Sequence, residues 1–234
     1  MSCRRSTEAA PSPRFLIVQT GTTLPQLRAR HGDFAEWFRR GLGLNREEAV
    51  VAGVDTGATL PEARGYAAII VTGSSAMVSE RLRWSEETAA WLRRAIAVGV
   101  PVLGVCYGHQ LLAHALGGHV DYHPNGREVG TVNIEKLASS VGDALLGSSP
   151  ANFLAHASHR QSVLELPPGA VSLARSAHDQ HHAVLYAPAA WGLQFHPEFS
   201  SEILQGYLRH RASAADGDCR ADCCVDPVQA PAPY

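Results

Sequence analysis

Three side chains, Cys106, His196 and Glu198, have the residue types and local settings that nucleophilic catalysis requires. Cys106 stands in Gly104-x-Cys106-x-Gly108, between an apolar run that fits a buried strand and a segment with helical spacing. This pattern is typical of a nucleophile elbow, with sulfur in place of a serine hydroxyl. A helix that begins at this turn directs its amide hydrogens and positive dipole end toward the sulfur. Both favour the thiolate, which is the reactive form.

The alternative interpretation of Cys106 is a buried core cysteine, because free cysteine is among the most buried residue types. The two flanking glycines favour the nucleophile. Glycine weakens both strands and helices unless the backbone needs the space. An unperturbed cysteine, with a pKa of about 8.5, is only a few per cent ionised at pH 7, so the elbow needs a partner base.

The segment His196-Pro197-Glu198 offers that base at the end of a predicted strand. A proline pushes the preceding residue into an extended conformation, where residues i and i+2 lie on the same side. Glu198 can then reach the imidazole of His196, set its tautomer and leave the other ring nitrogen to take the thiol proton. The alternative is a surface turn in which His196 only caps the next helix.

Polar groups that could bind a substrate lie close to the elbow in the sequence. Gln110 is one helical turn after Cys106 and on the same face, where it can offer its amide group. The turn Thr72-Gly73-Ser74 follows a neighbouring strand and can supply a backbone N–H. Together with the Tyr107 N–H it would form an oxyanion hole. The alternatives are an exposed helix glutamine and an ordinary strand-to-loop turn.

The elements that must position these residues alternate between strands and helices in the first half of the chain. The strands are predicted at residues 15–19, 49–54, 66–71 and 100–105, with one helix capped by Asp33 and another from Ser85 to Gly99. This alternation predicts a parallel sheet covered on both faces. Gly21, Gly73 and Cys106 follow strand ends and should therefore meet at one edge. The stripe of Phe34, Trp37, Phe38 and Leu42 is interpreted as core.

The second half of the chain predicts shorter strands separated by turns. They are expected at residues 119–123, 128–135, 153–157, 170–176, 181–187 and 191–195, before a last helix that begins at Ser200-Ser201-Glu202. We therefore predict one α/β domain over residues 14–211. Residues 1–13 form a predicted disordered leader, and residues 212–234 form a predicted disordered tail.

Composition and charge exclude several classes of protein. The 234 residues suffice for one sizeable domain, and 20 basic against 22 acidic side chains give no sign of a nucleic-acid or membrane surface. The sequence contains no apolar run of about 18 residues and no secretory signal, so we expect a cytoplasmic protein. The five cysteines do not form a disulfide framework. Lys136 is the only lysine, which excludes a Walker-type phosphate loop, and no Gly-x-Ser-x-Gly is present.

Two histidine-containing segments are possible rivals to this site. His178-Asp179-Gln180-His181-His182 has metal-ligand types but no evident partner elsewhere at structural spacing, so we interpret it as a polar turn before a strand. His109 could compete with His196 as the base, but at a helix start against the sheet a structural hydrogen bond fits better. Cys219, Cys223 and Cys224 in the predicted tail are treated as no site. We predict no metal and no cofactor.

The sequence Gly-Val-Cys-Tyr-Gly-His-Gln, with His-Pro-Glu downstream, resembles the class I glutamine amidotransferases. It is most similar to stand-alone relatives of the amidotransferase half of GMP synthase, over roughly residues 14–211. The resemblance implies a flavodoxin-like, doubly wound, mostly parallel sheet of seven strands with helices on both faces. It further implies hydrolysis of the glutamine side-chain amide through a γ-glutamyl thioester, without a cofactor.

The resemblance also assigns roles to residues. It makes Cys106 the nucleophile, His196 the general base and acid and Glu198 the orienting carboxylate, with the Gly73 and Tyr107 amides holding the oxyanion. Gln110 and the segment Ser158-His159-Arg160-Gln161 occupy places where the family grips the α-amino and α-carboxylate groups of glutamine.

The chain departs from the family pattern at two places. Thr72-Gly73-Ser74 replaces the usual Gly-Gly-Pro or Asn-Gly-Pro, and Gln161 stands where relatives of GMP synthase often carry aspartate.

Three functions remain open from the sequence. The first is a glutaminase that delivers ammonia to a separate synthetase subunit, since this chain carries no ATP-binding motif. The second is a γ-glutamyl peptidase that uses the same three residues. The third is a non-catalytic partner or regulatory module, against which the complete Cys106, His196 and Glu198 set argues.

Overall fold

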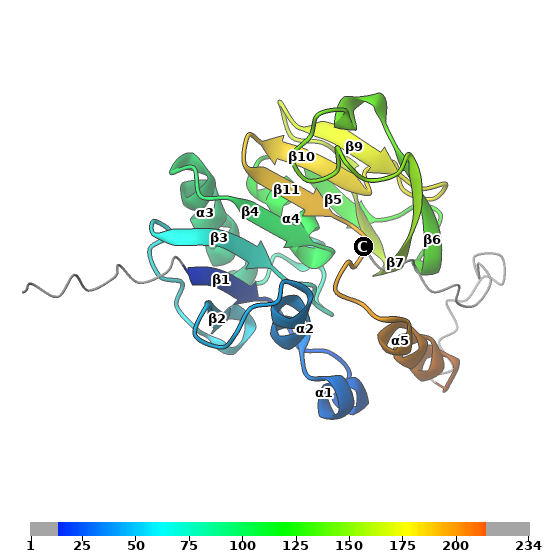
Figure 1. The fold of residues 1–234 in the computed structure, drawn as a ribbon, viewed down its shortest axis with the longest axis horizontal. Coiled ribbons are helices and arrows are strands. Elements are labelled where there is room, and N and C mark those ends of the chain that lie inside the picture. The colour runs from blue at the N-terminus through cyan, green and yellow to red at the C-terminus, as the bar shows by residue number, and fades with distance from the viewer. Residues whose placement is uncertain (1–13, 214–234) are drawn as a thin grey trace, which may run out of the picture.

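The computed structural model describes residues 14–213, so the predictions for the leader and for most of the tail lie outside the described residues. A parallel set of strands forms the centre of the fold (Figure 1). These strands are β1 (Arg14–Gln19), β2 (Ala49–Gly53), β3 (Tyr66–Val71), β4 (Val102–Val105) and β11 (Ala190–Leu193). They pair in the order β2-β1-β3-β4-β11, each parallel to its neighbour. The predicted parallel core is confirmed.

An antiparallel extension continues the same sheet beyond β11. It consists of β10 (Ala183–Ala187), β9 (Val171–Arg175), β6 (Glu128–Lys136) and β7 (Asn152–His159), in that order. The described sheet therefore has nine strands and is mixed, whereas the resemblance implies seven mostly parallel strands. The difference arises because β9, β6 and β7 continue the ladder of hydrogen bonds past β10. A separate pair joins β5 (His119–Tyr122) and β8 (Gln161–Glu165), and β8 was not predicted.

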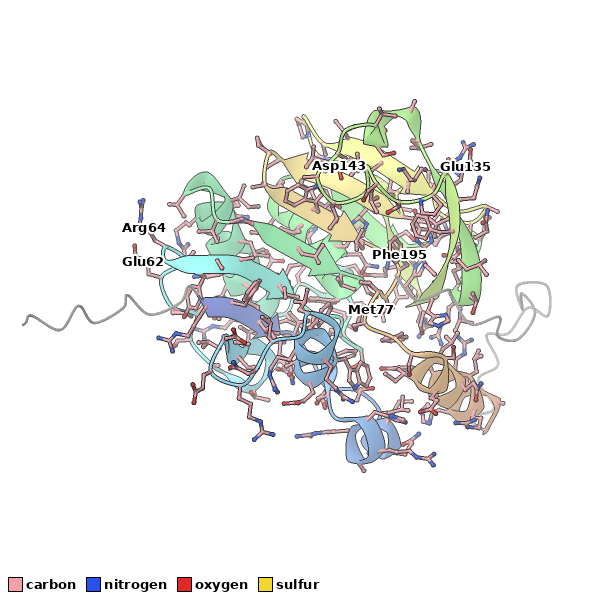
Figure 2. The ribbon with its side chains drawn as sticks, in the orientation of Figure 1. Glu62, Arg64, Met77, Glu135, Asp143 and Phe195 are labelled. Carbon is pink, nitrogen blue, oxygen red and sulfur yellow. The ribbon has the colours of Figure 1, made fainter. Side chains whose placement is uncertain are left out.

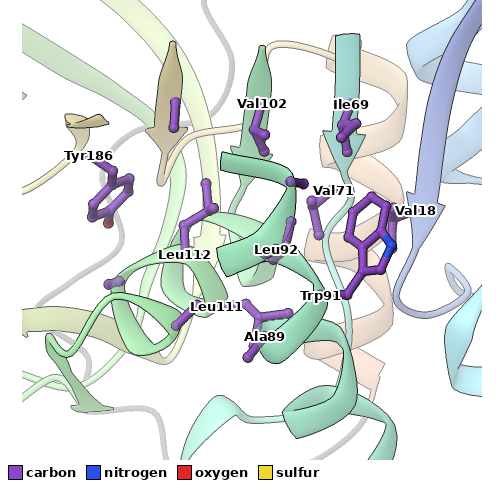
Figure 3. Packing of buried hydrophobic residues seen from close by; sticks show 14 of the residues in the cluster. Val18, Ile69, Val71, Ala89, Trp91, Leu92, Val102, Leu111, Leu112 and Tyr186 are labelled. Atoms are coloured by element: carbon purple, nitrogen blue, oxygen red, sulfur yellow. The ribbon is translucent and has the colours of Figure 1, made fainter. Parts of the chain in front are cut away.

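Helices cover both faces of the sheet, as predicted. On one face, α3 (Arg83–Ala97) and α4 (Tyr107–Ala115) bury Leu92, Leu111 and Leu112 against strand residues such as Val71 and Val102. Figure 3 shows these side chains packed between the helices and the strands. None of the three leucines has measurable exposure. Burial of a leucine contributes about 1.5–3 kcal/mol, so this layer fixes where α4 begins.

The opposite face carries α2 (Phe34–Gly41), which packs Ala35 and Phe38 against β1 and β3. Two further helices, α1 (Pro25–His31) and α5 (Ser201–Ser213), join it through a cluster that contains Trp37 and Phe199. Asp33 caps α2 as predicted, with its carboxylate 2.9 Å from the Phe34 nitrogen. The aromatic stripe is buried as expected, but Leu42 lies just past the helix end and is half exposed.

One predicted boundary was wrong and one helix was missed. Helix α3 begins at Arg83 and not at Ser85, because the buried Ser85 hydroxyl is engaged with the Tyr107 hydroxyl at 2.6 Å. Helix α1 was not predicted, although Pro25 stands at its first turn, where proline is favoured. Short 3-10 turns occur at Val54–Thr56, Val78–Glu80 and Ala138–Ser140. Charged side chains such as Glu62, Arg64 and Glu135 point outward, whereas Phe195 lies in the interior (Figure 2).

The carboxyl ends of the parallel strands meet at one edge, as predicted from Gly21, Gly73 and Cys106. The Thr20 nitrogen donates to the Thr72 hydroxyl across β1 and β3 at 3.1 Å. The Cys106 nitrogen donates to the Leu193 carbonyl at 2.7 Å, which ties β4 to β11. The edge therefore brings together residues that are far apart in the sequence. Among residues 14–213, no helix has the length and apolarity needed to cross a bilayer.

Candidate active site

Cys106 occupies a strained turn between β4 and α4. Its backbone has φ +51° and ψ −102°, and the only other non-glycine residue with positive φ among the described residues is Arg81. Such a conformation costs about 1–3 kcal/mol and persists only where the surroundings impose it. The strain is consistent with a nucleophile elbow and not with an ordinary core cysteine.

The two glycines that flank Cys106 make this turn possible. A Cβ at Gly104 would lie 2.4 Å from the Gly108 carbonyl oxygen, and a Cβ at Gly108 would lie 2.3 Å from the Val71 carbonyl oxygen. Both distances are shorter than any real carbon contact. The chain therefore needs glycine at both places so that α4 can start directly against β3 and β4.

His196 and Glu198 form a buried pair just after β11. The Nδ1 atom of His196 lies 2.7 Å from Oε1 of Glu198, and the two side chains are 4% and 1% exposed. The His196 nitrogen donates to the His156 carbonyl at 2.7 Å, and its ring stacks on Phe199 at 3.9 Å between centroids. The imidazole is thus held by Glu198 and Phe199, and the backbone that carries it is anchored to His156. Because a carboxylate only accepts, Nδ1 carries a proton and Nε2 is left for the thiol.

The electrostatics of the pair favour a thiolate and an imidazolium. Burial raises the pKa of the Cys106 thiol, but the charge and hydrogen bond of His196 outweigh it, and the net pKa is lowered. Burial lowers the pKa of His196, whereas the Glu198 carboxylate and Cys106 raise it, to about 10. Both shifts favour the pair of a charged sulfur and a protonated base, which is the reactive state of a cysteine nucleophile.

The loop after β3 is held rigidly next to this pair. The Thr20 hydroxyl lies 2.9 Å from the Thr72 carbonyl and 3.0 Å from the Gly73 carbonyl. A Cβ at Gly73 would lie 3.2 Å from Cε1 of His196, so the loop backbone directly borders the imidazole. No role for Thr20 was predicted, because the only signal in the sequence is a polar residue directly after a strand.

A pocket of about 290 Å³ opens above Cys106 and His196. The predicted substrate residues Gln110, Ser158, His159 and Arg160 all line it, together with Tyr107. The carbonyl oxygen of Ser158 is 3.9 Å from the Cys106 sulfur. The structure thus brings the predicted nucleophile, base and substrate residues to one pocket, and Gly73 lies next to His196 at its border.

The side-chain amide nitrogen of Gln110 is already hydrogen-bonded within the protein. Its Nε2 lies 2.6 Å from the Gln161 carbonyl and 2.9 Å from Oε1 of Gln194. A backbone carbonyl can only accept, so the nitrogen must face Gln161 and donates to both partners. The Oε1 atom of Gln110 is therefore the group left for a ligand. Gln161 itself is buried and binds Ser79 through its side chain.

The rival histidines have other roles. His109 is buried, and its Nδ1 is 3.0 Å from the Tyr186 hydroxyl. Burial lowers the pKa of His109 to about 3, so it is neutral and does not rival His196 as a base. Residues 178–182 form a turn before β10, as predicted. The Nε2 atoms of His182 and His159, however, both lie within hydrogen-bond distance of the Glu128 carboxylate. Cys219, Cys223 and Cys224 lie outside the described residues.

Sequence reasoning missed several residues that the fold brings to the site. Arg127 and Arg211 line the pocket with Arg160, and Glu128 lies directly behind it. Glu128 offered a signal, a lone acidic residue at the start of a strand that is otherwise apolar on one face. Arg127 and Arg211 offered none, because their proximity depends on how β6 and α5 pack beside the elbow.

The chain belongs to the class I glutamine amidotransferase family, whose model matches residues 31–211. It is 32% identical over 203 residues to a GMP synthase (glutamine-hydrolyzing) of Aeropyrum pernix. The aligned region covers 84% of this chain and 36% of that protein. A GMP synthase of Thermomicrobium roseum is 38% identical over 145 residues, or 60% of this chain and 26% of that protein. The chain thus spans about a third or less of these relatives.

A shorter relative and two solved structures agree with this assignment. The relative, named as one subunit of the GMP synthase of Methanopyrus kandleri, is 34% identical over 116 residues, which is 47% of this chain and 60% of that protein. A glutamine amido transferase from Methylobacillus flagellatus superposes with a TM-score of 0.72 at 27% identity, covering 93% of this chain and 82% of that one. A glutamine amidotransferase from Thermotoga maritima has the same fold, with a TM-score of 0.69 at 19% identity over 86% and 83% of the two chains.

Proposed function

We propose that this protein is a glutaminase of the class I amidotransferase type, with Cys106 as its nucleophile. The observation that supports the proposal best is the convergence of three parts of the chain. The strained elbow carries Cys106, and the buried His196–Glu198 pair faces it across one pocket. A domain that only binds a partner has no physical need for a strained backbone at a cysteine that lines a pocket, nor for a carboxylate that orients the base.

The reaction proceeds in two halves. The Cys106 thiolate attacks the side-chain carboxamide carbon of glutamine and forms a tetrahedral oxyanion. This intermediate collapses as the C–N bond breaks, and the His196 imidazolium gives its proton to the departing ammonia, which leaves a γ-glutamyl thioester. His196, now neutral, takes a proton from water, and the hydroxide releases glutamate and restores the thiolate. Glu198 holds the imidazole in the tautomer that both halves require.

Backbone and side-chain groups around the pocket bind the substrate. The Gly73 and Tyr107 amides hold the oxyanion, and the rigid loop that Thr20 fixes supports this role for Gly73. The Oε1 atom of Gln110 accepts from the α-amino group of glutamine, since its nitrogen is occupied. Ser158 and Arg160 bind the α-carboxylate. His159 borders the same place.

The ammonia goes to a separate synthetase subunit. The family to which the chain belongs acts on glutamine. One relative is itself named as a subunit of GMP synthase, which supports a glutaminase and a synthetase on two separate chains. We place both subunits in the cytoplasm.

Incubation of the purified protein with glutamine tests the proposal. We expect glutamate and ammonia in equal amounts, and we expect Cys106→Ala to abolish their release while it leaves the fold intact by circular dichroism. Retained ammonia release in that variant would refute Cys106 as the nucleophile. No release by the wild-type protein, with or without a candidate synthetase, together with no labelling of Cys106 by a glutamine-like diazoketone, would favour the non-catalytic module.

A second candidate function is cleavage of γ-glutamyl peptides by the same three residues. The observation that favours it is the charge of the pocket. Arg127, Arg160 and Arg211 line it, and no carboxylate stands among its described lining residues. The Nη1 atom of Arg211 is buried without a hydrogen-bond partner among the described residues. The Arg211 guanidinium can therefore bind a second carboxylate, which a γ-glutamyl amino acid brings on its leaving group and glutamine lacks.

Comparison of kcat/KM for glutamine and for γ-glutamylglycine separates the two functions. If the peptide is the substrate, it is cleaved faster than glutamine, and Arg211→Gln lowers kcat/KM for the peptide much more than for glutamine. If glutamine is the substrate, the peptide is cleaved poorly, and Arg211→Gln changes kcat/KM by the same factor for both compounds. The free amino acid released from the peptide and the ammonia released from glutamine are the direct readouts.

A further inference from the structure

A second carboxylate–imidazole cluster lies behind the pocket and takes no part in the steps above. It consists of Glu128 of β6, His159 at the end of β7 and His182 just before β10. Oε2 of Glu128 is 2.8 Å from Nε2 of His159 and 2.6 Å from Nε2 of His182. The Glu128, His159 and His182 side chains are 9%, 1% and 0% exposed. A buried carboxylate is costly unless its partners satisfy it, and the Ser176 hydroxyl adds a third donor to Oε1 at 2.8 Å.

The hydrogen bonds of His159 define its protonation. Its Nδ1 lies 3.0 Å from the Gln161 carbonyl oxygen, which can only accept, so Nδ1 carries a hydrogen. Its Nε2 faces the Glu128 carboxylate. If that carboxylate is ionised, Nε2 also carries a hydrogen and the ring is an imidazolium. Three donors converge on Glu128, which favours the ionised form.

The electrostatics agree with this geometry. Burial raises the pKa of Glu128, but its bonds to His159 and His182 outweigh burial and hold the pKa well below its usual range. Burial lowers the pKa of His159, yet Glu128 outweighs this too, and the pKa is raised. His182 differs from His159, because its Nδ1 is buried without a hydrogen-bond partner among the described residues.

His159 is also close to the nucleophile. It lines the same pocket as Cys106, and its charge adds to that of His196 in lowering the pKa of the thiol. The residue before it, Ser158, places its carbonyl 3.9 Å from the sulfur. The titratable groups that face His159 come from several elements: Glu128, Cys106, His109, His123, His178, Asp179 and His182.

We propose that His159 is a permanently charged positioning residue, held as an imidazolium by Glu128, that stabilises the Cys106 thiolate together with the catalytic base His196. Its Nδ1–H and the Gln110 amide together clamp the Gln161 carbonyl and so fix the backbone that borders the pocket. Because both of its N–H groups are used inside the protein, His159 is not a hydrogen-bonding ligand of the substrate. This inference rests on the proposed function, in which Cys106 is the nucleophile.

The same three side chains have donor atoms within 4.8 Å of one another, close enough for a metal ion. Their separations of 2.6 and 2.8 Å are those of hydrogen bonds. Ligand atoms around a tetrahedral zinc at about 2.0–2.2 Å would stand further apart, about 3.3 Å. A metal would also require both imidazoles to lose the hydrogens that satisfy the buried carboxylate. The geometry therefore favours the charged pair, and metal content is one outcome of the test.

Nitrogen NMR of the wild-type protein labelled with ¹⁵N-histidine tests the charge directly. The His159 signals are assigned by their absence in His159→Gln. We expect both His159 ring nitrogens to remain protonated from pH 6 to pH 9. A His159 ring that loses a proton with a midpoint near 6.5 would overturn the inference, as would one stoichiometric zinc that is retained through purification.

The rate of Cys106 alkylation against pH tests the effect on the nucleophile. A nearby positive charge lowers the pKa of a thiol, so Glu128→Gln and His159→Gln should each raise the midpoint by about one pH unit, which means about tenfold less thiolate on the rising limb. His182→Gln is the matched control. It alters the same cluster but leaves the Glu128–His159 pair, so the midpoint should not move. Equal midpoints in all four proteins would refute the electrostatic role.

These results separate this inference from the proposed function. A charged His159 in a protein that neither hydrolyses glutamine nor is labelled by a glutamine analogue would leave the cluster intact and refute the glutaminase. A neutral His159 in an active glutaminase would refute only the inference.

Discussion

Replacement of His196 by glutamine should convert Cys106 from a reactive thiolate into an ordinary buried thiol. The imidazolium of His196 outweighs the effect of burial on the pKa of Cys106 in the native site. Glutamine has similar size and can still bond to Glu198, but it carries no charge. Without the charge, burial dominates, and the pKa of the thiol should rise above its ordinary value of about 8.5.

The expected magnitude follows from the pKa of His196. A pKa of about 10, against 6.5 for a free imidazole, corresponds to about 5 kcal/mol in favour of the imidazolium at about 1.4 kcal/mol per unit. Glu198 and Cys106 both provide this energy. If the interaction with Cys106 supplies only a third of this energy, about 1.5 kcal/mol, its loss in His196→Gln lowers the population of the Cys106 thiolate about tenfold. Alkylation at pH 7 should therefore be at least about tenfold slower in His196→Gln.

Iodoacetamide alkylation between pH 5 and 10 is the assay. The background protein carries serine in place of Cys3, Cys219, Cys223 and Cys224, so that only Cys106 reacts. We expect the two rate profiles to differ most near neutral pH and to approach each other only toward pH 10, as the thiol of the variant ionises. His210→Gln, which changes another histidine that lines the pocket, is the control and should follow the wild type. Superimposable profiles for His196→Gln and wild type would refute the thiolate–imidazolium pair.

Three further predictions concern the packing around the elbow. Gly108→Ala should lower the free energy of unfolding by about 1–3 kcal/mol in urea titration, because its Cβ would meet the Val71 carbonyl at 2.3 Å, whereas Gly41→Ala, with no atom within 4 Å, should be nearly neutral. Tyr186→Phe should cost about 1–3 kcal/mol, because it leaves buried His109 atoms unpaired, and should not change glutamine turnover; a loss of turnover would reinstate His109 as a base. The pKa of His109 is about 3 folded and 6.5 unfolded, so the unfolded state binds the extra proton between these values. The free energy of unfolding should therefore fall as the pH drops from 6.5 toward 3, by up to about 1.4 kcal/mol per pH unit. The fall should be smaller in His109→Gln, and equal slopes in the two proteins would contradict a buried, neutral His109 ring.

Much of the parallel half of the fold was predictable from sequence because its signals are local. Buried strands such as β1 and β3 read as continuous apolar runs, and Asp33 is a strong helix cap. The elbow was predictable for the same reason, since Gly104, Cys106 and Gly108 must be close in sequence to make the turn.

The antiparallel half was less predictable because its pairing is not local. The strand β8, which begins at Gln161, lacks clear alternation, and its burial depends on α4 and β5 packing over it. Likewise, Glu128, His159 and His182 form one cluster only because β6, β7 and β10 lie in one region of the fold. The separation of 54 positions between Glu128 and His182 leaves no spacing pattern to detect.

The central claim is that Cys106 forms a covalent acyl intermediate with a γ-glutamyl substrate. Mass spectrometry of the protein after reaction with 6-diazo-5-oxo-norleucine, followed by peptide mapping, tests it most directly. We expect one adduct per chain, carried by the peptide that contains Cys106, absent from Cys106→Ala and prevented by excess glutamine or γ-glutamylglycine. An unmodified Cys106, or an adduct that neither compound competes away, would contradict the claim.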